Sequence, residues 1–193
     1  MSVLVCWLQR SLAALCLLML TLLPIPWLGL EIQPAQAALN TNSYDGNIYA
    51  LYAGNGSLVP PRSTLEQAMA ADRPVVIVYY LDDASASKRY APVVSELQRL
   101  WGNALELMPL ATDPLQNRPD GGPTDPAHYW SGVVPQVVVL DGSGTVRLNA
   151  SGPVELTRIN AAISAATGLP LPQGVGQETT MSFNELNSEV VSR

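Results

Sequence analysis

The feature that most constrains this chain is an uninterrupted apolar run, Val75 to Leu81, that ends abruptly at two aspartates. The run is too short for an isolated helix and is rich in β-branched and aromatic residues, so it predicts a strand buried on both faces. From Ser87 the apolar residues recur at helical spacing as far as Leu100. A buried strand that turns directly into an amphipathic helix is typical of open α/β sheets, where such turns usually carry the chemistry.

Periodicity and turn residues predict the remaining elements. The other strands are expected at residues 48–53, 104–110, 136–140 and 145–149. Helices are expected at residues 64–71, 87–101 and 127–131, and from Pro153 to a glycine stop at Gly168. A capping box should open the first helix, with Ser63 and Glu66 satisfying backbone N–H groups. Residues 111–126 form a long loop rich in Pro, Gly and Asp.

Several of these residues resemble the thioredoxin family. A buried strand, a four-residue turn, Lys88 and then Ala91-Pro92 within the next helix are similar to the active-site segment of thioredoxins. Val134-Pro135 is similar to the cis-proline site of the family, and the Asp-Gly-Ser-Gly of residues 141–144 resembles its final hairpin turn. The resemblance implies an α/β fold, a three-layer sandwich around a mixed central sheet, in the order βαβαβαββα.

The turn itself departs from the family pattern. Where a thioredoxin carries Cys-x-x-Cys, this chain has Ala84, Ser85, Ala86 and Ser87. Val78 stands in the place of the family's buried acid, and Asp83 in the place of its tryptophan. The groups that run dithiol chemistry are missing together, whereas those that build the fold are kept. The resemblance therefore predicts a redox-inactive domain without a cofactor, which serves as a protein-binding or assembly module.

A partner-binding surface is expected next to the cis-proline site. In thioredoxins the residue before this proline pairs its backbone with a bound polypeptide, a role that needs no cysteine and that falls here to Val134. Tyr129 and Trp130 precede it, and aromatic side chains are common anchors in interfaces, although both rings could instead cover the sheet. The predicted partner-binding residues are Asp82, Asp83, the turn 84–87, Tyr129, Trp130, Val134 and Pro135.

The leading alternative is an enzyme on the same fold that works without cysteine. Ser87 would be the nucleophile, and it would need His128, the only histidine of the chain, as its base, with Asp83 completing the group. The sequence shows neither a nucleophile elbow nor an oxyanion hole for such chemistry. An enzyme is therefore the weaker interpretation.

Composition and the acidic loop exclude other classes of function. The net charge is −6 and Lys88 is the only lysine, so no basic stripe is available for nucleic acid. Asp113, Asp120 and Asp125 could hold calcium, but their spacing does not match an EF-hand loop and favours a solvated loop without metal. Both cysteines, Cys6 and Cys16, lie in the apolar N-terminal segment, so the domain can form no disulfide of its own.

The N-terminus has the pattern of an export signal. Arg10 precedes an apolar run from Ser11 to Leu30, and an Ala-x-Ala site ends at Ala37, which predicts cleavage there. An uncleaved membrane anchor is the alternative, because the run is long enough to span a bilayer. The predicted parts are a signal or anchor at 1–37, a linker at 38–47, the domain at 48–172 and a disordered tail at 173–193.

Both interpretations of the N-terminus place the domain outside the cytoplasm. The chain also resembles exported thioredoxin-like proteins of cyanobacteria, which implies the thylakoid lumen or the periplasm. The expected partner is another protein, such as a membrane complex, and an uncleaved N-terminal segment would itself hold the chain in the membrane.

Overall fold

The structure, a computed structural model, describes residues 39–172. Its centre is a four-stranded sheet in the order β2-β1-β3-β4, formed by β1 (Val75–Tyr80), β2 (Glu106–Ala111), β3 (Gln136–Leu140) and β4 (Val146–Ser151). β1 pairs with β2 in parallel and with β3 antiparallel, and β3 pairs antiparallel with β4. The sheet is therefore mixed, as predicted.

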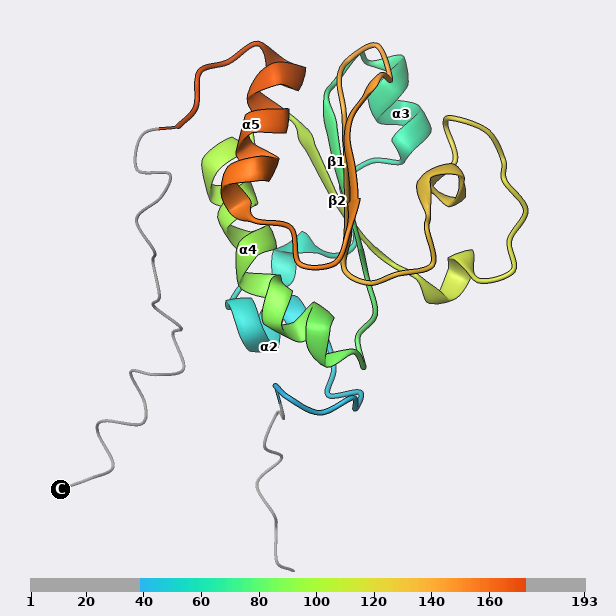
Figure 1. Cartoon of the computed structure of the whole chain (residues 1–193), viewed down its shortest axis with the longest axis vertical. Helices are drawn as coiled ribbons and strands as arrows, with labels where there is room; N and C mark the ends of the chain where they lie inside the picture. Colours follow the sequence, from blue (N-terminus) through green and yellow to red (C-terminus); the bar gives the residue numbers. More distant parts are fainter. Residues whose placement is uncertain (1–38, 173–193) are drawn as a thin grey trace, which may run out of the picture. The chain divides into compact units, whose positions relative to one another are not determined.

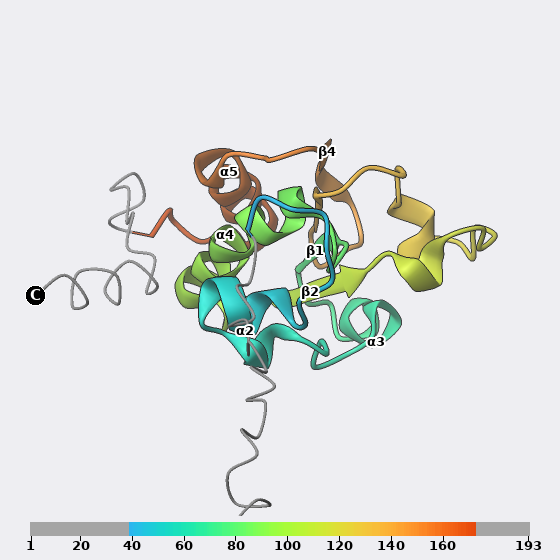
Figure 2. The ribbon, with the colours of Figure 1, turned by 90° about the horizontal axis from the view of Figure 1, so that it is seen from below.

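Helices cover both faces of the sheet (Figures 1 and 2). The bounds are α2 Ile48–Ala53, α3 Leu65–Ala70, α4 Ser85–Trp101 and α5 Leu156–Thr167, with short 3-10 helices η1 Gly56–Leu58, η2 Asp113–Leu115 and η3 Pro126–Tyr129. One core layer joins α2, α4 and α5 to the sheet, and the other joins α3 and η3 to it. This three-layer arrangement confirms the predicted fold class and is consistent with a thioredoxin-like sandwich.

The central strand is built as its sequence predicts. All six residues of β1 are buried, and they alternate between the two layers: Val76 and Val78 face the first, whereas Ile77 and Tyr79 face the second. Because side chains alternate along a strand, a strand in the middle layer must be apolar at every position. The prediction of a strand buried on both faces is confirmed.

The predicted first strand, residues 48–53, is wrong, because this segment is helix α2. The Asn47 side chain caps the helix by accepting from the backbone N–H groups of Tyr49 and Ala50, and Gly54 ends it with a left-handed backbone, φ 60°. Ile48 and Tyr49 are buried together at the start of the helix. The weak alternation of two tyrosines suggested a strand, but local caps and burial decide in favour of a helix.

Other predicted boundaries shift by a few residues. The capping box exists one residue later than expected: the Thr64 side chain accepts from Gln67 N–H, and the Gln67 side chain accepts from Thr64 N–H. The predicted helix at 127–131 is only the 3-10 helix η3. The order βαβαβαββα is therefore not kept here, nor at the predicted first strand, which is a helix. α4 begins two residues before the expected start, at Ser85, and contains Pro92.

The end of the domain follows the prediction more closely. The turn at 141–144 is organised by Asp141, whose Oδ1 accepts from the N–H groups of Ser143 and Thr145 at 2.9 and 3.0 Å. α5 ends at Gly168, which has φ 71°, the conformation that favours glycine. Trp101 on α4 donates from its indole Nε1 to the buried Asn160 Oδ1 on α5 at 2.7 Å, which fixes the two helices to each other.

Parts of the chain lie outside the described residues. These include the predicted signal or anchor at 1–37, both cysteines and the predicted tail at 173–193. None of the helices within 39–172 has the length and apolar character needed to cross a membrane. The domain boundaries remain predictions.

Candidate functional site

The turn 84–87 lies where β1 passes into α4, as the sequence predicts. The Ser87 hydroxyl and the Ser85 N–H are bonded within the protein. Ser87 is 2% exposed, and its Oγ accepts from Leu81 N–H at 3.1 Å. Ala84 occupies the N-cap position without a side chain to cap the helix, and the N–H of Ser85 instead donates to Asn42 Oδ1 at 3.0 Å. The Ser87 side chain thus supports the structure of the turn and is not presented to solvent as a reactive group.

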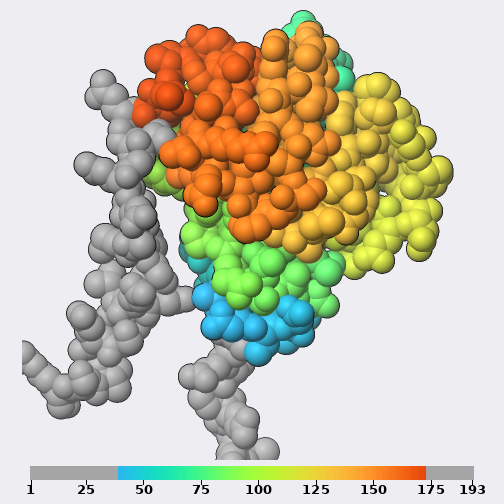
Figure 3. All heavy atoms as spheres, viewed as in Figure 1, coloured from blue at the N-terminus to red at the C-terminus, as the bar shows by residue number. Residues whose placement is uncertain are grey.

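Asn42 belongs to a segment that was predicted to be a linker, residues 38–47. We call residues 39–45 the entry segment, because the chain enters the domain through it. It lies against the start of α4, as the blue spheres beside green show in Figure 3. The segment therefore caps a helix that follows it by more than 40 residues, a contact that no local sequence pattern reveals.

Lys88 is the second contact of the entry segment. Its side chain is fully buried, although lysine is among the residues least often buried. The ammonium group is bonded to the carboxylate of Asp45, and it lies 3.3 Å from the Thr41 carbonyl oxygen and 5.7 Å from the centre of the Tyr52 ring. This bonding to Lys88, followed by a hydrogen bond from Tyr52, lowers the pKa of the Asp45 carboxyl.

In the sequence, Lys88 stands out as part of the family resemblance and as the only lysine of the chain. The sequence offers one further sign that this residue is special: it directly follows the turn. Nothing in the sequence links it to Asp45, which precedes it by 43 positions. The ion pair is thus a tertiary feature.

The two aspartates of the turn differ in their environment. Asp83 is exposed, whereas Asp82 is half-buried. Burial raises the pKa of the Asp82 carboxyl, a backbone hydrogen bond from Ile48 opposes this effect, and the charges of Asp113 and Asp83 add to it. Of the two aspartates, only Asp83 is thus freely presented to a partner.

The peptide bond between Val134 and Pro135 is cis, in keeping with the predicted cis-proline site. Pro135 is buried, and its carbonyl accepts from Gly152 N–H at 2.7 Å. Val133 is 49% exposed. In the register of β1 with β3, Tyr79 lies opposite Gln136, so a continuation of this pairing would put Val134 opposite Leu81. The cis-proline site and the turn after β1 therefore lie side by side.

Tyr129 and Trp130 cover the sheet. Tyr129 is 7% exposed and donates from its hydroxyl to the Pro123 carbonyl at 2.8 Å. Its own carbonyl accepts from the Nε2 of buried Gln136 at 2.6 Å. The Trp130 ring lies 5.2 Å from that of Tyr79 on β1. Both aromatic residues belong to the second core layer, and their proposed role as partner anchors remains a prediction.

The predicted catalytic group is not assembled by hydrogen bonds. His128 Nδ1 lies 2.9 Å from both carboxylate oxygens of Asp120, and its ring packs edge-on against Tyr129. Ser87 bonds to Leu81, and among the described residues no hydrogen bond joins it to His128 or Asp83. The arrangement lacks the nucleophile-to-base contact that a hydrolase of this type needs.

Two of the three carboxylates of the loop 111–126, those of Asp120 and Asp125, bond to protein groups. Asp120 accepts from Gly122 N–H at 2.8 Å, and this bond, followed by His128, lowers the pKa of its carboxyl. Asp125 caps η3 and is paired with Arg118 at 2.6 Å. Within the described part of the chain, no three His, Cys, Asp or Glu side chains are grouped as metal ligands would be.

A hollow on the described surface lies away from this turn. It is an open groove of about 830 Å³ at the C-terminal ends of α2 and α4, beside the chain that follows α5. Asn55, Gln98, Arg62 and Leu169 are among its lining residues. No local sequence pattern indicates this groove, because its walls come from segments far apart in the chain.

Fold and site together define a cysteine-free α/β sandwich whose turn between β1 and α4 is closed by the chain's own entry segment. No family model matches the chain. The chain is 37% identical over 199 residues to thylakoid membrane protein slr1796 of Synechocystis sp. (strain ATCC 27184 / PCC 6803 / Kazusa), and the match covers 99% of this chain and 98% of that protein. It belongs to the same family as that protein, and this relative confirms the predicted link to cyanobacteria.

Proposed function

We propose that this protein is a redox-inactive, thioredoxin-like module that binds another protein at the thylakoid membrane. The observation that carries the proposal is the turn 84–87, which lacks cysteine and whose Ser87 hydroxyl and Ser85 N–H are both bonded within the domain. Because the turn lacks cysteine and these groups are already bonded inside the domain, it supports a structural or binding role. The name of the relative and the predicted export signal support the location.

The partner would bind at Val133 and Val134, beside the cis-proline. Val133 presents an apolar side chain that is 49% exposed, and the adjoining Gln136, held by Ser131 and Asn149, keeps the segment in place. Among residues 39–172, no hydrogen bond is formed by the backbone of Val134. An extended segment of a partner could therefore pair with this backbone as an added strand does.

The test is an affinity pull-down of the tagged full chain from native thylakoid membranes. We expect one defined partner protein, and we expect Val133→Asp to reduce its recovery several-fold because a charge would be buried in the apolar contact. Val146→Asp is the matched control, since Val146 is 45% exposed at the start of β4. N-terminal sequencing of the recovered chain would decide between a cleaved signal and an anchor.

Two results would contradict the proposal. One is equal recovery of the partner by the Val133→Asp and Val146→Asp chains. The other is recovery of the unsubstituted chain with no partner at all. As a control, both variants must unfold at the same temperature as the unsubstituted chain. A loss of partner recovery is then not caused by a loss of folding.

A further inference from the structure

The chain enters the domain along a fixed path. Asn42 caps α4, and Asp45 is bonded to the fully buried Lys88, so the entry segment is held at two separate places. Arg89 adds a contact of 3.4 Å to the side chain of Asn40. The entry segment therefore has a defined place on the surface of the domain.

The end of the domain that carries the entry segment must lie near a bilayer whenever the apolar run is in the membrane. The run ends at Leu30, and Leu39 begins the described residues, a separation of nine positions (39 − 30). An extended chain spans at most about 3.6 Å per residue, so Leu39 lies within roughly 30 Å of the end of the run. In an anchored chain, the entry segment is thus held within this distance of the membrane.

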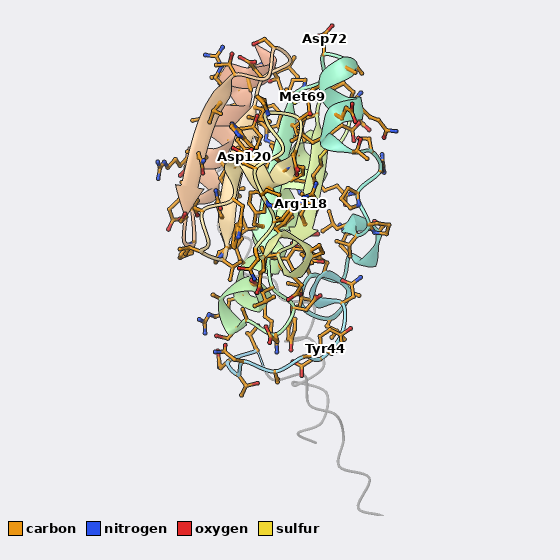
Figure 4. All side chains as sticks on the ribbon, turned by 90° about the vertical axis from the view of Figure 1, so that its right-hand side faces the viewer. Tyr44, Met69, Asp72, Arg118 and Asp120 are labelled. Carbon is orange, nitrogen blue, oxygen red and sulfur yellow. The ribbon has the colours of Figure 1, made fainter. Side chains whose placement is uncertain are left out.

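Exposed apolar side chains are found at the same end. Tyr44 is 73% exposed, and Leu39 and Leu51 are 40% and 39% exposed. Leu51 on α2 lies beside the entry segment, because its Cδ1 is 3.6 Å from the place where a side chain on Gly46 would begin. Figure 4 shows Tyr44 at the end of the domain opposite to Asp72. Tyrosine is enriched where proteins meet the bilayer interface, because its ring is apolar and its hydroxyl is polar.

The charge of this end is also compatible with a lipid surface. In an acidic chain, the stretch from Leu39 to Pro61 contains a single charged residue, Asp45, and Lys88 compensates it. The neighbouring turn and helix contribute Asp82, Asp83 and Arg89, so no cluster of positive charge is present to attract anionic lipid. The surface therefore fits uncharged headgroups.

We propose that Leu39, Tyr44 and Leu51, which we call the entry face, contact the headgroup region of an uncharged lipid bilayer. The contact orients the domain so that the turn between β3 and β4 points away from the membrane. This inference rests on the membrane association proposed above, and it adds the face that meets the lipid.

The test uses the full chain reconstituted into phosphatidylcholine vesicles. Cys6 and Cys16 are changed to serine, and one new cysteine, Tyr44→Cys or Val146→Cys, carries an environment-sensitive fluorophore. We expect the emission of the label at position 44 to shift to shorter wavelength, and nitroxide lipids to quench it several-fold more strongly than at position 146. The shift should persist in 0.5 M salt (roughly a 4 Å Debye length), because the contact is apolar. Adding Leu39→Ser and Leu51→Ser should reduce the emission shift of the label at position 44.

Several outcomes would overturn the inference. Equal quenching at positions 44 and 146 would mean that the domain does not dock through the entry face. A shift that appears without vesicles and grows with protein concentration would assign the face to contacts between copies of the chain. Loss of the shift in high salt would show that the contact is electrostatic and not apolar. The pull-down with Val133→Asp is independent of these results, so failure here leaves the partner-binding proposal standing.

Discussion

At the scale of single residues, burial decides which polar groups remain available for chemistry. Ser87 ends a turn that would be reactive in a thioredoxin and Lys88 follows it, yet they are 2% and 0% exposed. A buried polar group needs a hydrogen-bond partner, and both residues have one inside the domain. The Ser87 hydroxyl accepts from the Leu81 N–H, and the Lys88 ammonium bonds to Asp45. The same residues thus support the fold at the place where catalysis was conceivable.

A substitution separates the structural role of Ser87 from a catalytic one. Ser87→Ala should lower the free energy of unfolding by about 1–3 kcal/mol, because the N–H of Leu81 loses its buried acceptor. Ser85→Ala, in the same turn, should change it by no more than about 0.5 kcal/mol. Chemical denaturation measures both. An unchanged stability of the Ser87→Ala chain would contradict the assignment of this hydroxyl as a buried acceptor.

At the scale of elements, the ends of helices depend on single side chains that sequence patterns locate only to within one residue. Ser63 and Thr64 are both acceptable caps by residue type. The structure uses Thr64, and it leaves the buried Ser63 Oγ without a hydrogen-bond partner. The helix α2 shows the same point, since Asn47 and Gly54 define it although its apolar residues alternate like those of a strand.

Removal of the Ser63 hydroxyl and removal of the Thr64 hydroxyl, both just before α3, should therefore have different effects on stability. Thr64→Ala removes the acceptor of Gln67 N–H and should cost about 1 kcal/mol of stability. Ser63→Ala removes a buried hydroxyl that bonds nothing, and should leave stability unchanged or slightly increased. Thermal unfolding of the two chains side by side is the measurement. The reverse order of stabilities would place the cap at Ser63.

At the scale of the whole molecule, carboxylates fix both a contact between distant segments and a turn of the sheet. Asp45 joins the entry segment to α4, and Asp141 organises the turn between β3 and β4. Hydrogen bonds, led by that from Ser143, hold the pKa of Asp141 at about 2, against an ordinary value of 3.8. Because the folded state binds the proton more weakly than the unfolded state, these groups stabilise the fold when they are ionised.

The stability of the domain should therefore fall in acid. The contribution of Asp141 is complete above pH 3.8, the unfolded value, and is lost as the pH falls through about 2. Asp45 and Asp120, whose carboxyl pKa values are also lowered, act in the same direction, whereas Asp82, whose pKa is raised, acts in the opposite one. Denaturant midpoints of the natural chain and Asp141→Asn should differ at pH 7 and converge towards pH 2. A constant difference would show that ionisation of Asp141 contributes nothing.

The sequence by itself determined the middle layer and the class of fold. A run of six buried residues from Val75 to Tyr80, a helix at the correct spacing and a turn of Asp-Gly-Ser-Gly are local patterns, and each specifies its own structure. The absence of cysteine from the turn 84–87 was equally plain, because the identity of a residue requires no tertiary information.

Only the tertiary structure decided how the turn is closed. The bonds of Lys88 to Asp45 and of Ser85 to Asn42 each cross 43 positions of the chain, and no periodicity connects residues so far apart. The same holds for Tyr129, which the sequence presents as a possible anchor and the fold buries beneath its own loop. Local propensity and periodicity act over a few residues, whereas the burial of a charge and its pairing depend on which distant segments the fold brings together.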